Sequence, residues 1–309
     1  IFVIGHLKER FVFRGFKRGL FREIFTYTSF IAINIVVDQI NWNIDKLLLA
    51  RYKGTVAVAV YSVGYTLNNY YSMVSTAISG VFTPLVHRII NDTHSNLIVQ
   101  RKQLTELFTR VGRVQFLILA LVSSGLVFFG MPFIRFWAGE GYDDAYYVVL
   151  LLTLPATVPL IQNVGIEIQR AQNKHKFRSI VYLLMALVNL GVSIVFCQWW
   201  GAIGSALGTA ISLVLANGFL INIYYQKKCN IDVISFWKSI LRMFKGLVVP
   251  IVFGTLIMMF VEFHSFIQLA CWIVLYSVVY CINAWVFSMN KYEKELITTP
   301  LKELVLKGK

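Results

Sequence analysis

Eight stretches of this sequence are long and apolar enough to cross a lipid bilayer as helices, which takes about 20 mostly apolar residues. Core helices of soluble domains do not repeat eight times at this length and apolarity. We therefore predict an all-α integral membrane protein, a polytopic helical bundle of eight transmembrane helices. The predicted spans are residues 27–50, 55–87, 114–131, 144–168, 179–198, 202–225, 246–263 and 266–288.

The composition supports a membrane protein and excludes two other classes. Hydrophobic residues make up 57% of the 309 residues and charged residues 14%, against about 45–50% and about 25% in soluble domains. Disordered chains are poor in apolar residues, and so few charges cannot cover a soluble surface. The net charge of +14 indicates either nucleic-acid binding or Lys and Arg held on the cytoplasmic side of a membrane. The positions of the charges decide between the two.

Basic residues gather on alternate connections between the spans. Twenty-five of the 29 Lys and Arg lie before span one, after spans two, four and six, and in the tail. The opposite loops hold only Arg51, Lys53 and Arg135. By the positive-inside rule both ends of the chain are cytoplasmic, as an even number of spans requires. No nucleic-acid partner is expected.

The same pattern divides the chain into segments. Residues 1–23 form a cytoplasmic basic linker, 24–228 a six-helix lobe, and 246–288 two additional transmembrane helices, with a cytoplasmic tail at 289–309. The segment 229–245 between them mixes apolar and basic residues at helical spacing, as does 91–108. We expect amphipathic helices on the inner leaflet there; solvated linkers are the alternative.

Span one carries a polar stripe. Asn34, Asp38, Asn41 and Asp45 are spaced four, three and four residues apart, so they share one helix face. Ionisable residues within a span are costly and usually face a water-filled cavity or a partner. Asp38 is the first candidate for proton or sodium coupling. The alternatives are that Asp38 pairs with a buried Lys or Arg, and Asp45 with Lys46 or Arg51.

Span two repeats the pattern. The hydroxyl, tyrosine and amide side chains that follow this stripe include Tyr65, Asn69, Ser72 and Thr76. They predict a second cavity lining, with Tyr65 and Asn69 bulkier than helix packing needs. A tight interface between spans one and two is the alternative, because small hydroxyl residues also pack membrane helices.

Span four combines two prolines with polar residues. Pro155 and Pro159 remove backbone donors and bend or loosen the helix. Gln162, Asn163 and Glu167 follow and are further cavity candidates, since broken helices are common at transporter sites. An ordinary kink, with a surface ion pair between Glu167 and Arg170, is the alternative.

No catalytic pattern stands out. HExxH, GxSxG, P-loop and dinucleotide-binding glycine motifs are absent from the sequence. The four cysteines include no CxxC pair that would suggest a metal site. We therefore expect no enzyme, catalytic residue, cofactor or metal. The glycines of Trp200–Ala210 are expected to serve helix packing.

Several stretches in order resemble one family. NWNIDKLLLARYKG (Asn41–Gly54), VAVYSVGYTLNNYYSMVSTAISGVFTPLVHRI (Val58–Ile89) and FFGMPFIRFWAGEGYDDAYYVVLLL (Phe128–Leu152) resemble the second lobe of lipid-linked oligosaccharide (O-antigen and related polysaccharide) flippases. QRAQNKHKFRSI and WGAIGSALGTAIS look like its later loop and helix. These flippases are MATE-like members of the multidrug/oligosaccharidyl-lipid/polysaccharide export superfamily, and the resemblance covers about residues 20–228.

The resemblance implies a transporter in the bacterial cytoplasmic (inner) membrane. It would flip a polyprenyl-diphosphate-linked repeat unit for surface polysaccharide biosynthesis, by alternating access. Its partners would be the lipid-linked oligosaccharide, membrane lipid and a coupling H+ or Na+. Family transporters have two six-helix lobes, often followed by two helices, so we expect a C-terminal portion, without its N-terminal lobe, of a protein that is monomeric when intact.

Three other functions compete with the flippase. An ion-coupled multidrug or small-cation exporter of the same superfamily would favour an acidic cavity. A membrane-embedded glycan polymerase usually has a large outer loop, and no outer loop here exceeds about a dozen residues. A scaffold without transport is disfavoured by the polar stripes.

Overall fold

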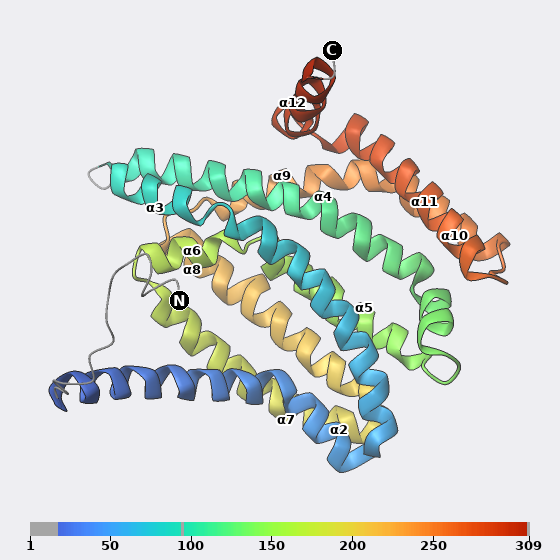
Figure 1. Ribbon diagram of the computed structural model, residues 1–309, viewed down its shortest axis with the longest axis horizontal. Coiled ribbons are helices and arrows are strands. Elements are labelled where there is room, and N and C mark those ends of the chain that lie inside the picture. Colours follow the sequence, from blue (N-terminus) through green and yellow to red (C-terminus); the bar gives the residue numbers. More distant parts are fainter. Residues whose placement is uncertain (1–17, 94–95, 308–309) are drawn as a thin grey trace, which may run out of the picture. The chain divides into compact units, whose positions relative to one another are not determined.

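The structure is a computed structural model that describes residues 18–93 and 96–307 (Figure 1). All regular elements in these ranges are helical, which confirms the predicted all-α class for this part of the chain. The chain divides into two compact units, Ile1–Ile44 and Asp45–Lys309. Each unit is described by itself, and the predicted segment boundaries stay predictions.

Most helices lie wholly in the second unit; α2 begins in the first. Up to residue 171 the chain contains α2 (Arg18–Gly80), α3 (Thr83–Asp92), α4 (Leu97–Ala138), α5 (Asp144–Leu160) and α6 (Val164–Ala171). From residue 175 on it contains α7 (His175–Leu213), the π-helical η1 (Val214–Leu220), α8 (Ile221–Lys228), α9 (Val233–Met243), the 3₁₀ turn η2 (Phe244–Leu247), α10 (Val248–Phe260), α11 (Phe266–Asn283), the π-helical η3 (Ala284–Ser288) and α12 (Lys291–Lys307).

Two long helices turn back on themselves at a glycine. Gly54 in α2 has φ 80° and Gly201 in α7 has φ 55°, conformations that residues with a Cβ rarely adopt. Ser193 Oγ donates to the Ser205 backbone oxygen, although 12 residues of straight helix would hold the two about 18 Å apart. Helix α7 is therefore a hairpin, whose limbs lie side by side in Figure 1.

Five helical stretches are long and apolar enough to cross a membrane: 43–92, 97–138, 176–228, 233–260 and 266–288. The bent pair α5 and α6 makes a sixth if it is one span. The predicted eight are not confirmed by this count, because 43–92 and 176–228 each run through a glycine turn. Only 17–33% of the most apolar window in each stretch is buried. Outward apolar faces of this extent fit lipid contact and a multi-pass membrane protein.

The predicted proline bend is confirmed. Helices α5 and α6 meet at 45° directly after Pro159. Ser75 Oγ on α2 donates to the Leu160 backbone oxygen at 2.8 Å. A neighbouring hydroxyl thus bonds a carbonyl at the break, as is usual for broken membrane helices.

The two predicted surface helices differ from the structure. The 91–108 prediction is wrong, because residues 97–108 begin the 42-residue helix α4. The Asn96 side chain caps its start by accepting from the Ile98 and Val99 amides, and no proline interrupts the helix before Pro132. Helix α9 does form in the 229–245 segment. Its apolar face is buried against the bundle, where Phe236 packs on Phe108, instead of facing lipid.

A buried ion pair fastens α12 to the bundle. Arg113 of α4 donates to both carboxylate oxygens of Glu293, at 2.5 and 2.9 Å. Its remaining N–H groups bond the Ser239 oxygens and the Ser288 backbone oxygen. All five guanidinium donors are therefore used, and this Arg113 clasp links α4, α9 and the start of α12.

Candidate cation site and polar helix face

The Asp45 carboxylate is buried in the bundle and bonded by hydroxyl groups. Its side chain lies on α2 and the residue is 5% exposed. Ser205 Oγ donates to Oδ1 at 2.7 Å, while Tyr61 Oη and Thr209 Oγ1 donate to Oδ2 at 2.9 Å each. None of the ion pairs within residues 18–93 and 96–307 includes Asp45. The alternative prediction, a pair with Lys46 or Arg51, is therefore wrong.

The glycine turns bring these groups together. Tyr61 follows Asp45 by 16 residues, which would span about 24 Å in a straight helix. The turn at Gly54 folds Tyr61 back onto Asp45. Ser205 and Thr209 are one helical turn apart on the second limb of α7, so both hydroxyls face the same carboxylate.

A second layer of oxygen atoms lies behind the hydroxyls, on the first limb of α7. Ser193 Oγ donates to Asn189 Oδ1 at 3.0 Å, and Asn189 Nδ2 donates to Thr209 Oγ1 at 3.3 Å. Ser193 and Ser205 are both fully buried. The Asn189 amide therefore lies one hydroxyl, that of Thr209, away from the carboxylate. We call Asp45, Tyr61, Asn189, Ser193, Ser205 and Thr209 the Asp45 site.

The chemistry of this site favours a proton or a hard cation. Neutral hydroxyl donors stabilise a carboxylate but do not cancel its charge, and a charge within a span costs about 2.5–3.5 kcal/mol. Each hydroxyl oxygen keeps lone pairs that a cation can use. Oxygen ligands suit hard cations, whereas softer transition metals prefer nitrogen and sulfur. Within the described residues no three His, Cys, Asp or Glu side chains gather as a metal cluster.

Tyr65 and Lys46 lie beside the Asp45 site. The Tyr65 ring stacks on Tyr61, with centroids 6.3 Å apart. The Lys46 ammonium lies 4.5 Å from the Tyr65 ring centroid. This pair therefore combines a cation with an aromatic face, next to the buried acid.

The predicted stripe on span two lies beside the packing face of α2. Tyr65 and Ser72 are half-buried, and Asn69 and Thr76 are exposed. The helix packs instead through Tyr71 and Ser75; the Tyr71 hydroxyl lies 2.6 Å from Thr157 Oγ1. Tight packing therefore does not describe Asn69 and Thr76. We call Tyr65, Asn69, Ser72 and Thr76 the polar face.

The span-four candidates form interior contacts. Gln162 and Asn163 are buried, and their amide nitrogens donate to Asn222 Oδ1 at 2.8 Å and to Ser75 Oγ at 3.1 Å. The structure thus places both in helix–helix contacts instead of on a cavity wall. Glu167 accepts from Arg170 at 2.7 Å, with the Arg170 side chain 64% exposed. This is the surface ion pair of the alternative prediction.

Three predicted residues of span one cannot be placed in the same way. Asn34, Asp38 and Asn41 belong to α2, but their side chains lie outside the described residues. The assignment of Asp38 to coupling therefore stays a prediction. Asp45 is the member of the stripe whose surroundings the structure defines.

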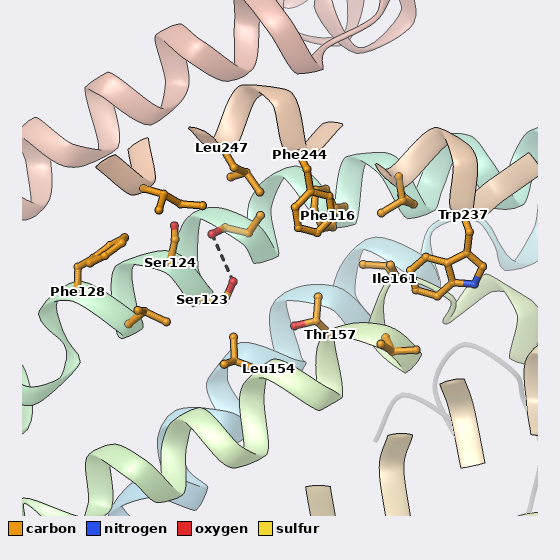
Figure 2. A pocket seen from close by; sticks show the side chains of 15 residues that line it. Phe116, Ser123, Ser124, Phe128, Leu154, Thr157, Ile161, Trp237, Phe244 and Leu247 are labelled. Atoms are coloured by element: carbon orange, nitrogen blue, oxygen red, sulfur yellow. Dashed lines mark hydrogen bonds between the residues drawn. The ribbon is translucent and has the colours of Figure 1, made fainter. Parts of the chain in front are cut away.

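An apolar cavity of about 430 Å³ lies between α4, α5 and residues of α9, η2 and α10 (Figure 2). Figure 2 shows Phe116, Phe244 and Leu247 on its wall, with Trp237 at one end. Its few polar groups are the hydroxyls of residues such as Ser123 and Thr157 and the indole N–H of Trp237. None of the predicted site residues lines it, and so apolar a wall is unsuited to a sugar.

The partners of Asp45 were not predicted from the sequence. Ser205 and Thr209 stand four residues apart, as do Asn189 and Ser193. That spacing could have indicated that each pair shares one helix face, but the surrounding glycines favoured an interpretation as helix packing. The packing prediction is also correct, because a Cβ on Gly208 would meet Ser193 Oγ.

Fold and site together define an all-helical, multi-pass membrane protein with a buried, oxygen-bonded carboxylate. Over residues 1–146 the chain matches the sequence model of a family described as polysaccharide biosynthesis protein. The match includes Asp45 and the polar face and ends before α7, which supplies the other half of the site. No curated protein and no solved structure matches the chain.

Proposed function

We propose that this protein is a flippase for polyprenyl-diphosphate-linked oligosaccharide repeat units in the bacterial cytoplasmic membrane, acting in surface polysaccharide biosynthesis by alternating access. The family match over residues 1–146 supports the polysaccharide substrate class. The hairpins support eight crossings, since limbs 176–200 and 202–228 of the second hairpin are each long enough for one. A MATE-like lobe followed by two further helices is part of this proposal.

The Asp45 site is the proposed coupling site, and it is the observation that carries the mechanism. A buried carboxylate that only hydroxyls stabilise gains most from a proton or a sodium ion. Binding there joins α2 to both limbs of α7. An ion that binds one arrangement of these helices better shifts the protein toward it, as alternating access requires.

The polar face is the proposed glycan path. The Asn69 amide and Thr76 hydroxyl are exposed and can bond sugar hydroxyls. The Tyr65 ring offers an apolar face to a sugar ring. The ammonium group of Lys46 lies beside it and supplies a positive charge for the diphosphate. Path and coupling site thus meet at Tyr65, which stacks on Tyr61.

A transport assay with Asp45→Asn tests the proposal. The readout is the amount of lipid-linked repeat unit that reaches the outer leaflet, measured over a range of pH and of sodium concentration. We expect transport to fall at least 10-fold and to lose its dependence on the ion. Glu167→Gln, which changes an acid of the exposed ion pair, is the matched control and keeps both. Normal ion-dependent transport by Asp45→Asn would refute the coupling role, and absence of flipping by the native protein would refute the flippase.

Labelling tests the proposed orientation. Glu140 is exposed between α4 and α5, in a loop expected outside the cell. Glu140→Cys, in a variant without other cysteines, should react with a membrane-impermeant maleimide added to intact cells. Labelling only after the cells are opened would invert the topology.

A further inference from the structure

A second cavity, of about 600 Å³, opens between the first half of α4, the α9 N-cap Asp232, Ser239 of α9, and Asn290. Its lining includes four basic and three hydroxyl side chains beside two acids, and it shares no residue with the Asp45 site. We call it the basic pocket. Its members from α4 follow helical spacing, with Arg101, Thr105 and Thr109 each four residues apart.

The acidic groups of the basic pocket are already engaged. Glu106 accepts from Arg110 on the same helix. Asp232 caps α9 by accepting from the Ser235 amide at 3.2 Å and from Ser235 Oγ at 2.8 Å. These bonds hold the pKa of the Asp232 carboxyl below its usual range. The acceptors of the pocket are therefore turned toward protein partners.

The donors, by contrast, remain available. Arg101 and Lys102 are exposed and belong to none of the ion pairs found within the described ranges. Thr105 Oγ1 accepts from the Asp232 amide at 2.9 Å, and Ser239 Oγ accepts from Arg113 at 3.0 Å. Each of these hydroxyls still has its own hydrogen to donate. The hydrogen-bond donors of the pocket therefore suit an anion.

One part of the wall of the basic pocket, at Ser239, is held in place before a ligand binds. Arg113 is 7% exposed and uses all five donors in the clasp with Glu293, Ser239 and Ser288. The clasp therefore holds the Ser239 hydroxyl in place and contributes no free donor. A preorganised site loses less conformational entropy when a ligand binds.

We propose that the basic pocket binds a phosphate-bearing anion. Arginine, lysine and hydroxyl donors on several sides of one cavity match a tetrahedral anion with three or more acceptor oxygens better than a planar carboxylate. Two sources share this chemistry: the headgroup of an acidic lipid, and a free phosphate or diphosphate. Ile98, on the pocket rim, is 83% exposed and Leu97 beside it 66%, which gives an acyl chain an apolar surface.

Binding to the purified full chain tests the proposal and separates the two sources. One arm titrates inorganic pyrophosphate into protein held in phosphatidylcholine nanodiscs and measures heat. The other replaces part of the phosphatidylcholine by phosphatidylglycerol and counts retained lipid by native mass spectrometry. We expect saturable binding in at least one arm, and the arm that responds identifies the source.

Three variants locate the binding. The double variant Arg101→Gln with Lys102→Gln should weaken it about 100-fold or more, since it removes two charge-assisted contacts. Thr109→Val keeps the shape and should weaken it about 2- to 10-fold. Lys238→Gln removes an exposed charge of α9 that does not line the pocket and should change affinity less than about 2-fold. No binding in either arm, or equal losses in Lys238→Gln and the double variant, would overturn the proposal.

Discussion

Asp45→Asn separates the structural role of Asp45 from its role in binding a cation. The change keeps the size of the side chain and removes its charge. The amide keeps one acceptor oxygen and replaces the other by an NH2 group, so a hydroxyl that faces the NH2 must turn and accept from it. The three bonds become neutral, and each weakens by about 1 kcal/mol, from about 1.5–3 to about 0.5–1.5 kcal/mol. Removal of a charge from a span returns about 2.5–3.5 kcal/mol. The two effects cancel to within about 1 kcal/mol, so stability without a bound cation should change little.

The cation-dependent part of the stability should disappear. A ligand that binds only the folded protein adds about 2.7 kcal/mol at 100 times its Kd, and the variant lacks the charge that attracts it. The assay is thermal unfolding of purified protein during titration with sodium chloride, with choline chloride as the ionic-strength control, and separately with pH. Native protein and Glu167→Gln should gain stability with one of the two cations. An equal gain by Asp45→Asn, or no response by the native protein, would refute the reasoning.

Three further predictions concern the packing at Gly208, the Arg113 clasp and the Asp232 cap of α9. Gly208→Val should lower the free energy of unfolding by about 1–3 kcal/mol, because its Cβ would meet Ser193 Oγ; Gly191→Val on the open side of α7 is the control and should change little. Arg113→Met should lower the free energy of unfolding by about 3–5 kcal/mol, because it leaves Glu293 buried and unpaired. The double variant with Glu293→Leu should recover much of this loss. Equal stability of the single and double variants in chemical unfolding would contradict a coupled pair. The pKa of the Asp232 carboxyl is lowered in the folded protein. Its contribution to the free energy of unfolding is therefore present above the unfolded pKa of about 3.9 and is lost as the pH falls through the folded value. Asp232→Asn keeps a capping side chain and should lose less stability below about pH 4 than the native protein does.

The helical class and the proline bend could be predicted from the sequence because both depend on local chemistry. Apolar runs of about 20 residues permit little besides membrane helices, and Pro159 removes a backbone donor wherever it stands. The start of α4 was harder. Residues 97–108 are amphipathic whether they lie on a membrane or continue a long helix, and only the bundle that covers Leu104 and Phe108 decides.

The Asp45 site shows where periodicity stops being informative. Spacing predicted that Asp45 belongs to a polar stripe of span one, but its partners lie 16 residues away at Tyr61 and 160 residues away at Ser205. Those contacts depend on two backbone turns at glycine and on which limbs pack together. The partners of Gln162 and Asn163 were hidden from the sequence for the same reason. An amide nitrogen in a span can donate to a neighbouring helix as well as to a substrate.

The turn at Gly201 closes the α7 hairpin within a single residue. Such a junction has no spare length, so one limb cannot slide along the other without breaking the bond from Ser193 to the Ser205 backbone. We therefore expect the two limbs to move together as one rigid unit. We expect a displacement of Thr209 to reach Asn189 through the bond between them. A loop inserted after Trp200 would uncouple the two limbs while leaving every hydrogen-bond partner of Asp45 in the sequence.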